Sequence, residues 1–399
     1  MSTDINVAVI GQGYVGLPLA IAAMESGFKV IGIDVDEKKI SSIKSGKSPI
    51  EDISNEVIES ALRSGKYNVS TEFKDVSESH IVLICVPTPL DGNHKPDLRI
   101  LTSAIESVAK NISAKTLLII ESTIEPGTTR NLLIPILEKV SNIRLNDLEV
   151  AYSPERIDPT NKKWTIINTP KLVAGFTPNA AKRAKDFYSR FIAQVDICDS
   201  LEVAETAKLL ENSFRLVNIS FINEIAMFCQ KIGIDVNDVI KAASTKPYGF
   251  MPFYPSVGVG GHCIPVDPLY LAEAARSVGA PTRFIDLADE INLGMPTYFV
   301  GRASEMLGGL KDKKVLVIGV AYKPNVSDVR ETPVELLIDG LKKSGAVVSW
   351  HDDLVKSWNG ESSVELGSGF DLAILATPHD YLDLSLLGKV PVLNTRGSK

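Results

Sequence analysis

The feature that most constrains the fold is the stretch INVAVIGQGYVGLPLAIAAMESGFKVIGIDVD at residues 5–36. Its apolar pattern predicts a strand, a glycine-containing turn, a helix that ends at Gly27 and a second strand that ends at Asp34. This is a βαβ unit. The chain is therefore expected to contain an α/β sheet near its start.

Three glycines and one acid stand at defined places in this unit. Gly11 can make a tight turn, Gly13 lets the backbone approach a pyrophosphate, and Gly16 lets helix and strand pack closely. The helix N-terminus would face the anion. Asp34 would accept hydrogen bonds from a ribose 2′-hydroxyl and repel a 2′-phosphate, which favours NAD over NADP. The alternative is a glycine-rich turn without a ligand, but strand, helix and acid are all in place.

The rest of the chain indicates three parts. The apolar runs HIVLICVPTP, TLLIIESTI and LEVAYSPE alternate with helix-patterned segments up to about residue 198, which predicts a doubly wound parallel sheet. Residues 201–232 contain no proline and no glycine and follow a helical apolar rhythm, which predicts one long helix. A helix of this length commonly links lobes or pairs with its symmetry mate, so we expect residues 199–295 to form a central helical domain.

A second α/β pattern begins near residue 311 and echoes the first, since FDLAILATPHD parallels SHIVLICVPTP. The expected fold class is α/β, with two Rossmann-type parallel-sheet lobes joined by a central helical domain that contains one long helix. The predicted domains are an NAD-binding lobe at 1–198, a helical dimerisation domain at 199–295 and a second Rossmann-like lobe at 296–399.

The second lobe has GVAYKPNVSDVRE in place of the glycine fingerprint. Lys323 and Arg330 in this segment could hold a different phosphate-bearing ligand at the carboxyl ends of the strands. The alternative is a surface loop with ordinary charges.

Composition excludes several other classes. The net charge is −7 and basic residues form no run, which argues against a nucleic-acid partner. No apolar run is long enough for a membrane span, and the N-terminus lacks the pattern of a signal peptide, so we expect a cytoplasmic location. The four cysteines share no CxxC spacing and the five histidines are scattered, so no metal site is predicted.

One cysteine differs from the others in its surroundings. Cys85 and Cys229 lie in apolar runs and are expected in the core, whereas Cys263 follows Gly260 and Gly261. The two glycines would allow a substrate to approach the backbone closely. In an NAD enzyme, a thiolate allows oxidation past the aldehyde, because a thiohemiacetal can lose a second hydride and become a thioester. A core or metal-site cysteine is the alternative.

Further candidates could serve this chemistry. The carboxylate of Asp267 would lie on the same side of the chain as Cys263 if the segment begins a helical turn. Lys208 and Asn212 are one turn apart on the long helix and could stabilise an oxyanion together, although Lys208 alone could be a solvated helix lysine. Thr123 and Glu155 each follow a strand of the first lobe; Glu155 could activate a water, and either could instead be a cap or a turn residue.

Taken in order, the motifs GQGYVGLPLA, VPTPL, ESTIEPGTT, YSPERIDP, AKLLENSFR, GVGGHCIPVDP, GVAYKPNVSDVRETP and NTRG cover almost the whole chain. The set resembles the UDP-glucose/GDP-mannose dehydrogenase family. The resemblance implies an N-terminal NAD lobe, a central dimerisation region and a C-terminal lobe for the nucleotide sugar. It also implies two successive NAD-dependent oxidations, from a sugar 6-hydroxyl to a carboxylate.

The resemblance assigns roles to matching positions. Cys263 matches the thioester-forming thiol, and Lys208 with Asn212 matches the oxyanion-stabilising pair. Asp267 and Glu155 match carboxylates for proton transfer and thioester hydrolysis, and Thr123 matches a residue that positions water. The cofactor-binding residues implied are Gly11, Gly13, Tyr14, Val15, Gly16, Asp34, Thr88, Thr123 and Arg330. The substrate-binding residues implied are Glu155, Arg156, Lys208, Asn212, Arg215, Tyr254, Gly260, Lys323 and Arg396.

Departures within the cysteine motif narrow the substrate. Members specific for UDP-glucose typically have lysine before the aspartate, where this chain has Val266. GGHCIPVDP is similar to the branch that acts on UDP-N-acetylhexosamines, and Pro265 with DPLYL favours the UDP-N-acetylglucosamine 6-dehydrogenase type over the UDP-N-acetylmannosamine type. His262 is expected in the pocket wall. A UDP-glucose dehydrogenase, a two-electron hydroxyacid dehydrogenase and a catalytically silent binder stay open as alternatives.

Overall fold

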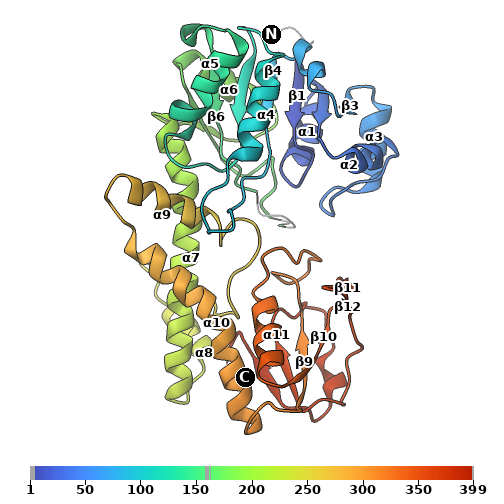
Figure 1. The fold of residues 1–399 in the computed structure, drawn as a ribbon, viewed down its shortest axis with the longest axis vertical. Helices are drawn as coiled ribbons and strands as arrows, with labels where there is room; N and C mark the ends of the chain where they lie inside the picture. Colours follow the sequence, from blue (N-terminus) through green and yellow to red (C-terminus); the bar gives the residue numbers. More distant parts are fainter. Residues whose placement is uncertain (1–4, 158–160, 162, 398–399) are drawn as a thin grey trace. The chain divides into compact units, whose positions relative to one another are not determined.

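The computed structural model describes residues 5–157, 161 and 163–397. The chain divides into two compact units, Met1–Leu210 and Glu211–Lys399, which are described separately below. The division falls inside helix α7 (Leu201–Lys231), which is the long helix predicted for residues 201–232 (Figure 1). No helix in the described ranges is both long and apolar enough to cross a bilayer.

The first unit is built on an eight-stranded sheet in the order β3-β2-β1-β4-β5-β6-β7-β8. The order from β3 to β6 is that of a Rossmann fold, and these six strands are parallel. The strands are β1 (Asn6–Ile10), β2 (Lys29–Ile33), β3 (Tyr67–Ser70), β4 (Ile81–Ile84), β5 (Leu117–Ile120), β6 (Glu149–Tyr152), β7 (Lys171–Gly175) and β8 (Val195–Ile197).

The prediction of an all-parallel first sheet is wrong at one place. Strand β7 pairs with β6 in the antiparallel sense, and β8 then runs parallel to β7. The physical reason lies in the connections, since a parallel crossover needs a helix or an equally long return, and no helix is present between β6 and β7 in the part of the chain that is described. Helix α6 (Pro178–Tyr188) stands between β7 and β8 and permits the parallel pair.

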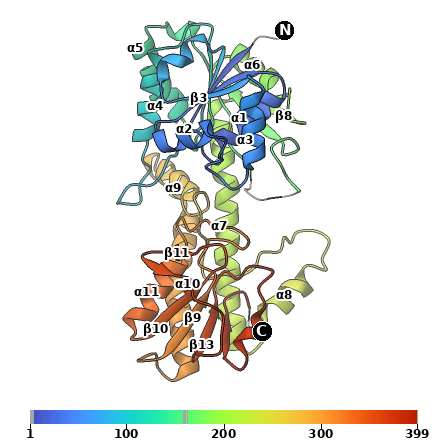
Figure 2. The ribbon, with the colours of Figure 1, turned by 90° about the vertical axis from the view of Figure 1, so that its right-hand side faces the viewer.

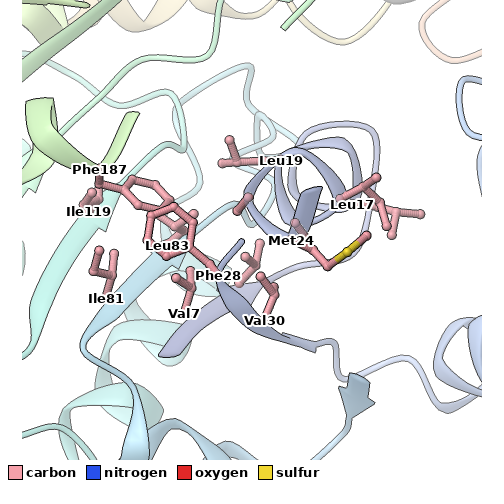
Figure 3. Packing of buried hydrophobic residues seen from close by; sticks show 14 of the residues in the cluster. Val7, Leu17, Leu19, Met24, Phe28, Val30, Ile81, Leu83, Ile119 and Phe187 are labelled. Carbon is pink, nitrogen blue, oxygen red and sulfur yellow. The ribbon is translucent and has the colours of Figure 1, made fainter. Parts of the chain in front are cut away.

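Helices cover both faces of this sheet, so successive residues of its strands enter two different cores. Val7 and Val9 of β1 belong to one core cluster, and Ala8 and Ile10 belong to the other. The first cluster includes the Phe28 and Phe187 rings, 5.2 Å apart between centroids (Figure 3). The other helices of this unit are α1 (Gly16–Glu25), α2 (Glu37–Lys44), α3 (Asn55–Arg63), α4 (Arg99–Ala109) and α5 (Ile134–Ser141).

The second unit contains a four-stranded parallel sheet in the order β10-β9-β13-β14 (Figure 2). The strands are β9 (Lys314–Ile318), β10 (Val347–His351), β13 (Leu372–Leu375) and β14 (Val392–Asn394), and a small hairpin joins β11 (Ser357–Trp358) to β12 (Glu361–Ser362). The helices are α8 (Val236–Ala243), α9 (Asp267–Ser277), α10 (Arg283–Leu307) and α11 (Val334–Lys343). Met295 and Phe299 of α10 share a core with Leu337 of α11 and Val315 of β9.

The two sheets repeat the same turn after their first strands, which confirms the echo between the halves. Gly11 follows β1 with a φ of +92°, and Gly319 follows β9 with a φ of +82°. A Cβ on Gly11 would lie 2.5 Å from the Cys85 carbonyl oxygen, and a Cβ on Gly319 would lie 1.9 Å from that of Thr377. Both turns therefore require glycine, because the chain bends toward the neighbouring strand end.

Candidate active site

The glycine loop of the first unit fits a pyrophosphate. A Cβ on Gly16 would lie 1.9 Å from the Gly11 carbonyl oxygen, so Gly16 is required for packing, whereas a Cβ on Gly13 would meet nothing within 4 Å. Helix α1 begins at Gly16 with Val15 as its N-cap, and no side chain caps its first N–H groups. Tyr14 packs against the first core cluster. The loop thus offers open space and N–H donors where the dinucleotide was predicted.

Asp34 lies at the position predicted to bind the ribose, and its carboxylate also accepts a hydrogen bond from the glycine loop. Its Oδ2 accepts a hydrogen bond of 2.8 Å from the Gln12 N–H, and its Oδ1 accepts one of 3.0 Å from Asp36. The ammonium of Lys39 lies 2.6 Å from Oδ2 and was missed by sequence reasoning. In the second unit Asp352 accepts a hydrogen bond of 2.9 Å from the Val320 N–H in the same way. Thr88, the remaining predicted cofactor residue after β4, is buried.

At the carboxyl edge of the first sheet, Glu155 follows β6 and is held by its own turn. Its Oε1 accepts hydrogen bonds from the N–H groups of Arg156, at 2.6 Å, and Ile157. The guanidinium of Arg156 donates to the Pro170 carbonyl oxygen at 2.9 Å, so this predicted substrate residue braces the turn. Thr123 follows β5 at the same edge and is partly buried.

A buried ionic cluster beside Glu155 was missed by sequence reasoning. The ammonium of Lys171 lies 2.5 Å from Glu121 Oε2 and 3.7 Å from Glu155 Oε2. The hydroxyl of Tyr188 donates to the other oxygen of Glu121. Burial lowers the pKa of Lys171, but the two carboxylates outweigh this effect and hold the pKa above its ordinary value. The only sequence signal was a lysine at the head of the apolar strand KLVAG.

The segment that contains Thr123 is fastened to α7 by another buried acid. Glu205 is fully buried, and its carboxylate accepts hydrogen bonds from the N–H groups of Gly127, at 2.5 Å, and Thr129, at 3.1 Å. Lys208 follows Glu205 by one turn and is only 8% exposed. The alternative of a solvated helix lysine is therefore wrong, and the buried ammonium belongs to the same helix face as Asn212.

In the second unit, Cys263 lies in the turn that starts α9. Its side chain is exposed, and its carbonyl oxygen accepts hydrogen bonds from the N–H groups of Val266, at 3.2 Å, and Asp267, at 2.8 Å. The predicted placement of Asp267 beside Cys263 required a helical turn here, and this is that turn. Asp267 is buried, and its Oδ2 accepts a hydrogen bond of 2.5 Å from the Asn212 amide. Asn212, Asp267 and the cysteine turn are thus brought together.

The two glycines before Cys263 lie close to another segment of the second unit. A Cβ on Gly261 would lie 2.8 Å from the Tyr322 ring, and a Cβ on Gly260 would lie 2.5 Å from the Glu331 carbonyl oxygen. The Gly261 N–H also donates to the Arg330 carbonyl oxygen at 3.1 Å. These glycines therefore let the chain's own segment from Tyr322 to Glu331 approach the cysteine turn.

The other predicted ligand residues of this unit lie in several settings. The guanidinium of Arg330 forms a two-pronged ion pair with Asp328, with contacts of 2.6 to 3.0 Å, so its fork faces its own loop. Lys323 lies over the Tyr322 ring. Arg396 is partly buried, and its carbonyl oxygen accepts a hydrogen bond from Asn237. Arg215 and Tyr254 are exposed.

Cys85, Cys229 and His262 are buried or partly buried, unlike the exposed Cys263. Cys229 is buried in α7, as predicted, and Cys85 is partly buried behind the glycine loop, where burial raises the pKa of its thiol. Burial also lowers the pKa of His262, and the positive charge of Arg330 adds to the effect, so this imidazole is neutral at pH 7. Within the described ranges, no three His, Cys, Asp or Glu side chains gather in a way that could hold a metal ion.

Comparison with known proteins decides the family. Three models of the UDP-glucose/GDP-mannose dehydrogenase family match in order: the NAD binding domain at 5–192, the central domain at 202–293 and the UDP binding domain at 316–395. The chain belongs to this family. It is an NAD-dependent nucleotide-sugar dehydrogenase that oxidises UDP-sugars.

Individual relatives agree over nearly the whole chain. A UDP-N-acetyl-D-glucosamine 6-dehydrogenase of Pseudomonas aeruginosa is 37% identical over 89% of this dehydrogenase and 84% of the relative. A UDP-N-acetyl-D-mannosamine dehydrogenase of Methanococcus maripaludis is 35% identical over 94% and 86%. The solved structure of a UDP-D-ManNAc dehydrogenase from Pyrococcus horikoshii superimposes with a TM-score of 0.90, at 31% identity over 98% of this chain and 95% of that one.

Proposed function

We propose that this dehydrogenase oxidises the C6 hydroxyl of a UDP-N-acetylhexosamine, UDP-N-acetylglucosamine in the first place, to the carboxylate. The observation that carries the proposal is the exposed thiol of Cys263 in a turn whose next helical residue, Asp267, is held by the Asn212 amide. An alcohol dehydrogenase that stops at the aldehyde would not need a nucleophile at this place.

The steps follow from the chemistry of these side chains. NAD, when bound, accepts one hydride in each of the two oxidations. Asp267 takes the hydroxyl proton in the first, while the Lys208 ammonium and the Asn212 amide stabilise the developing negative oxygen. The Cys263 thiolate then adds to the aldehyde carbon, and the resulting thiohemiacetal loses its hydride to become a thioester. Glu155 activates the water that hydrolyses the thioester, with Thr123 positioning that water, and the thiol is released.

The choice of sugar rests on the residues next to the cysteine. Val266 is apolar and only 6% exposed, so it cannot supply the ammonium that UDP-glucose-specific members place there. The relatives named for UDP-N-acetylglucosamine and for UDP-N-acetylmannosamine are similar to this chain at nearly the same identity. UDP-N-acetylmannosamine is therefore the second candidate, because the two sugars differ only at one epimeric centre.

The remaining ligand residues complete the proposal. Lys323 and Arg396 are assigned to the nucleotide sugar, together with Arg156, Arg215, Tyr254 and Gly260. Arg330 is assigned to the cofactor. The three-domain division at residues 198 and 295 and a cytoplasmic location stay predictions.

A homodimer through α7 is also proposed. In the second unit, Phe214, Phe221 and Phe228 recur every seven residues along this helix, and each is about half exposed, at 49%, 59% and 58%. A heptad stripe of large exposed apolar rings is typical of a helix that pairs with a symmetry mate. Ile232 extends the apolar region at the end of the helix.

A stoichiometric assay tests the proposed reaction. The purified protein is incubated with NAD and, in turn, with UDP-glucose and with the glucosamine, galactosamine and mannosamine forms of UDP-N-acetylhexosamine, and NADH is counted per sugar consumed. We expect two NADH per UDP-N-acetylglucosamine. One NADH per sugar would indicate a two-electron dehydrogenase, and no NADH with any sugar would indicate a silent binder; either outcome would overturn the proposal.

A further inference from the structure

The buried cluster around Lys171 lies at the carboxyl edge of the first sheet, next to the turn that carries Glu155. Lys171 is 5% exposed, Glu121 is 1% exposed and Tyr188 is fully buried. A buried ammonium is costly unless carboxylates and hydrogen-bond acceptors compensate its charge. The Glu121 carboxylate, 2.5 Å from the Lys171 ammonium, already compensates its charge. Lys171 nevertheless makes further contacts with the turn that carries Glu155.

Three hydrogen bonds fasten that turn to the head of β7. The Lys171 ammonium donates to the Pro154 carbonyl oxygen at 3.1 Å, and the Arg156 guanidinium donates back to the Pro170 carbonyl oxygen at 2.9 Å. The Ser153 hydroxyl donates to the Leu172 carbonyl oxygen at 2.8 Å. These bonds fix residues 153–156 against Pro170 and against Lys171 and Leu172, the first two residues of β7.

The same ammonium also acts on the Glu155 side chain. Its Nζ lies 3.7 Å from Glu155 Oε2, while Glu155 Oε1 is occupied by the two N–H groups of its own turn. The positive charge thus faces the one carboxylate oxygen that the turn does not hold. A general base must be held within reach of the water that it activates, and this contact limits where the Glu155 carboxylate can lie.

We propose that Lys171 is a positioning residue for thioester hydrolysis, which holds the Glu155 carboxylate in place through its contacts with Pro154 and Glu155. This inference rests on the proposed function, because it assumes that Glu155 activates the water. Glu121 fixes Lys171 from the opposite side, and the Tyr188 hydroxyl fixes Glu121. Lys171 itself does not touch the reacting atoms.

The test removes the ammonium without leaving a buried charge behind. Lys171→Met alone would strand the Glu121 carboxylate in the core and endanger folding, so the working variant is Glu121→Gln/Lys171→Met, in which the amide oxygen can still accept from Tyr188. Arg183→Met is the control, because it removes a cation that contacts Glu149 at 4.0 Å, at the other end of the same strand β6, and that donates to the Lys115 carbonyl oxygen at 3.0 Å. Folding is checked by the melting temperature and by NAD affinity.

Pre-steady-state kinetics with UDP-N-acetylglucosamine and NAD in excess over enzyme separate the steps. In the double variant we expect a burst of two NADH per active site at an unchanged rate, followed by turnover at least tenfold slower, with a sugar acyl adduct on Cys263 detected by mass spectrometry. Glu155→Gln should give the same pattern, and adding the double substitution to Glu155→Gln should slow hydrolysis no further. The Arg183 variant should show neither effect.

Two results would overturn the role of Lys171. One is wild-type turnover of the folded double variant without an adduct, and the other is slowing that multiplies with that of Glu155→Gln. Failure of the proposed function is visible separately, because the wild-type protein would then yield fewer than two NADH per sugar whatever stands at position 171.

Discussion

The side-chain amide of Asn212 on α7 donates a hydrogen bond of 2.5 Å to Oδ2 of Asp267, the first residue of α9. This contact joins two positions 55 residues apart and fixes the carboxylate one turn from the Cys263 carbonyl. Because Asp267 is buried, losing its donor would leave a desolvated carboxylate with fewer partners. The pair thus links the long helix to the cysteine turn.

Replacing Asn212 by alanine tests that link. We expect kcat for UDP-sugar oxidation to fall by about 10- to 100-fold, because an oriented donor to the reacting groups is lost. NAD binding, which uses the glycine loop of the first unit, should not change. Steady-state kinetics and NAD titration make the measurement. An unchanged kcat would show that the contact is only structural.

Cys263 should be the first thiol to react with iodoacetamide at neutral pH. It is exposed, whereas Cys229 is buried and burial raises the pKa of both Cys85 and Cys198. Peptide mass spectrometry after brief alkylation should find the label at Cys263, and NADH production should fall in step with labelling. Cys229→Ala should retain activity. Labelling that begins at another cysteine while activity falls would contradict this assignment.

Gly261→Ala tests whether the cysteine turn needs close contact with Tyr322. Gly261 has a φ of +83°, and Gly279, which follows α9, has a φ of +76° but open space around a Cβ. Gly279→Ala should therefore destabilise the fold only by the strain of placing alanine in left-handed backbone, about 1–2 kcal/mol. Gly261→Ala should cost about 1–3 kcal/mol more, because the methyl group meets the ring, and it should also lower kcat.

The measurement for this pair is the melting temperature together with kcat. Tyr322→Ala in the Gly261→Ala background removes the obstructing ring and should restore part of the lost stability. Equal destabilisation by the two glycine substitutions would mean that the Tyr322 ring is not what excludes a side chain at Gly261.

Asp352 should make the second unit sensitive to acid. Burial raises the pKa of its carboxyl, but hydrogen bonds from His379 and from the Val320 and Val355 N–H groups outweigh burial and hold the pKa below its ordinary value. A carboxyl with a lowered pKa stabilises the fold above its unfolded pKa of about 3.9, and this stabilisation is lost as the pH falls through the folded value.

Asp352→Asn should therefore destabilise the second unit by about 2–4 kcal/mol at pH 7, and the difference from wild type should narrow below about pH 4. Trp350 is buried in this unit, two positions before Asp352 in the sequence, while Trp164 of the first unit is half exposed. Denaturant unfolding followed by tryptophan fluorescence should thus report mainly on the second unit. If the difference in unfolding free energy between wild type and Asp352→Asn does not change with pH, the role assigned to the Asp352 carboxyl is wrong.

Phe221→Glu tests the proposed homodimer. A charge in the centre of the heptad stripe should convert the dimer to a monomer, because a buried glutamate at a helix pair lacks a partner. Leu336→Glu is the control, since Leu336 is 50% exposed on α11, away from α7 in the sequence. Sedimentation velocity measures the mass. A wild-type protein that sediments as a monomer would refute the dimer directly.

Sequence reasoning captured much of the fold but less of the site's surroundings. The βαβ unit, the long helix and the echo between the sheets are local patterns, and each is present in the structure. The reversed strand β7 was missed, because strand direction depends on the connection and not on the apolar run itself. Asn212 and Asp267 were both selected as candidates, but the sequence did not show that they touch.

The sequence by itself determined where the chain must bend and which segments form strands and helices. Gly11 and Gly319 require left-handed backbone, and apolar periodicity extends over single elements, so both are properties of neighbouring residues. Only the tertiary structure decided that Lys171 meets Glu121, that Glu205 holds the Gly127 turn and that Tyr322 packs on Gly261. Those contacts join residues 50 or more positions apart, and their partners depend on strand order and on burial.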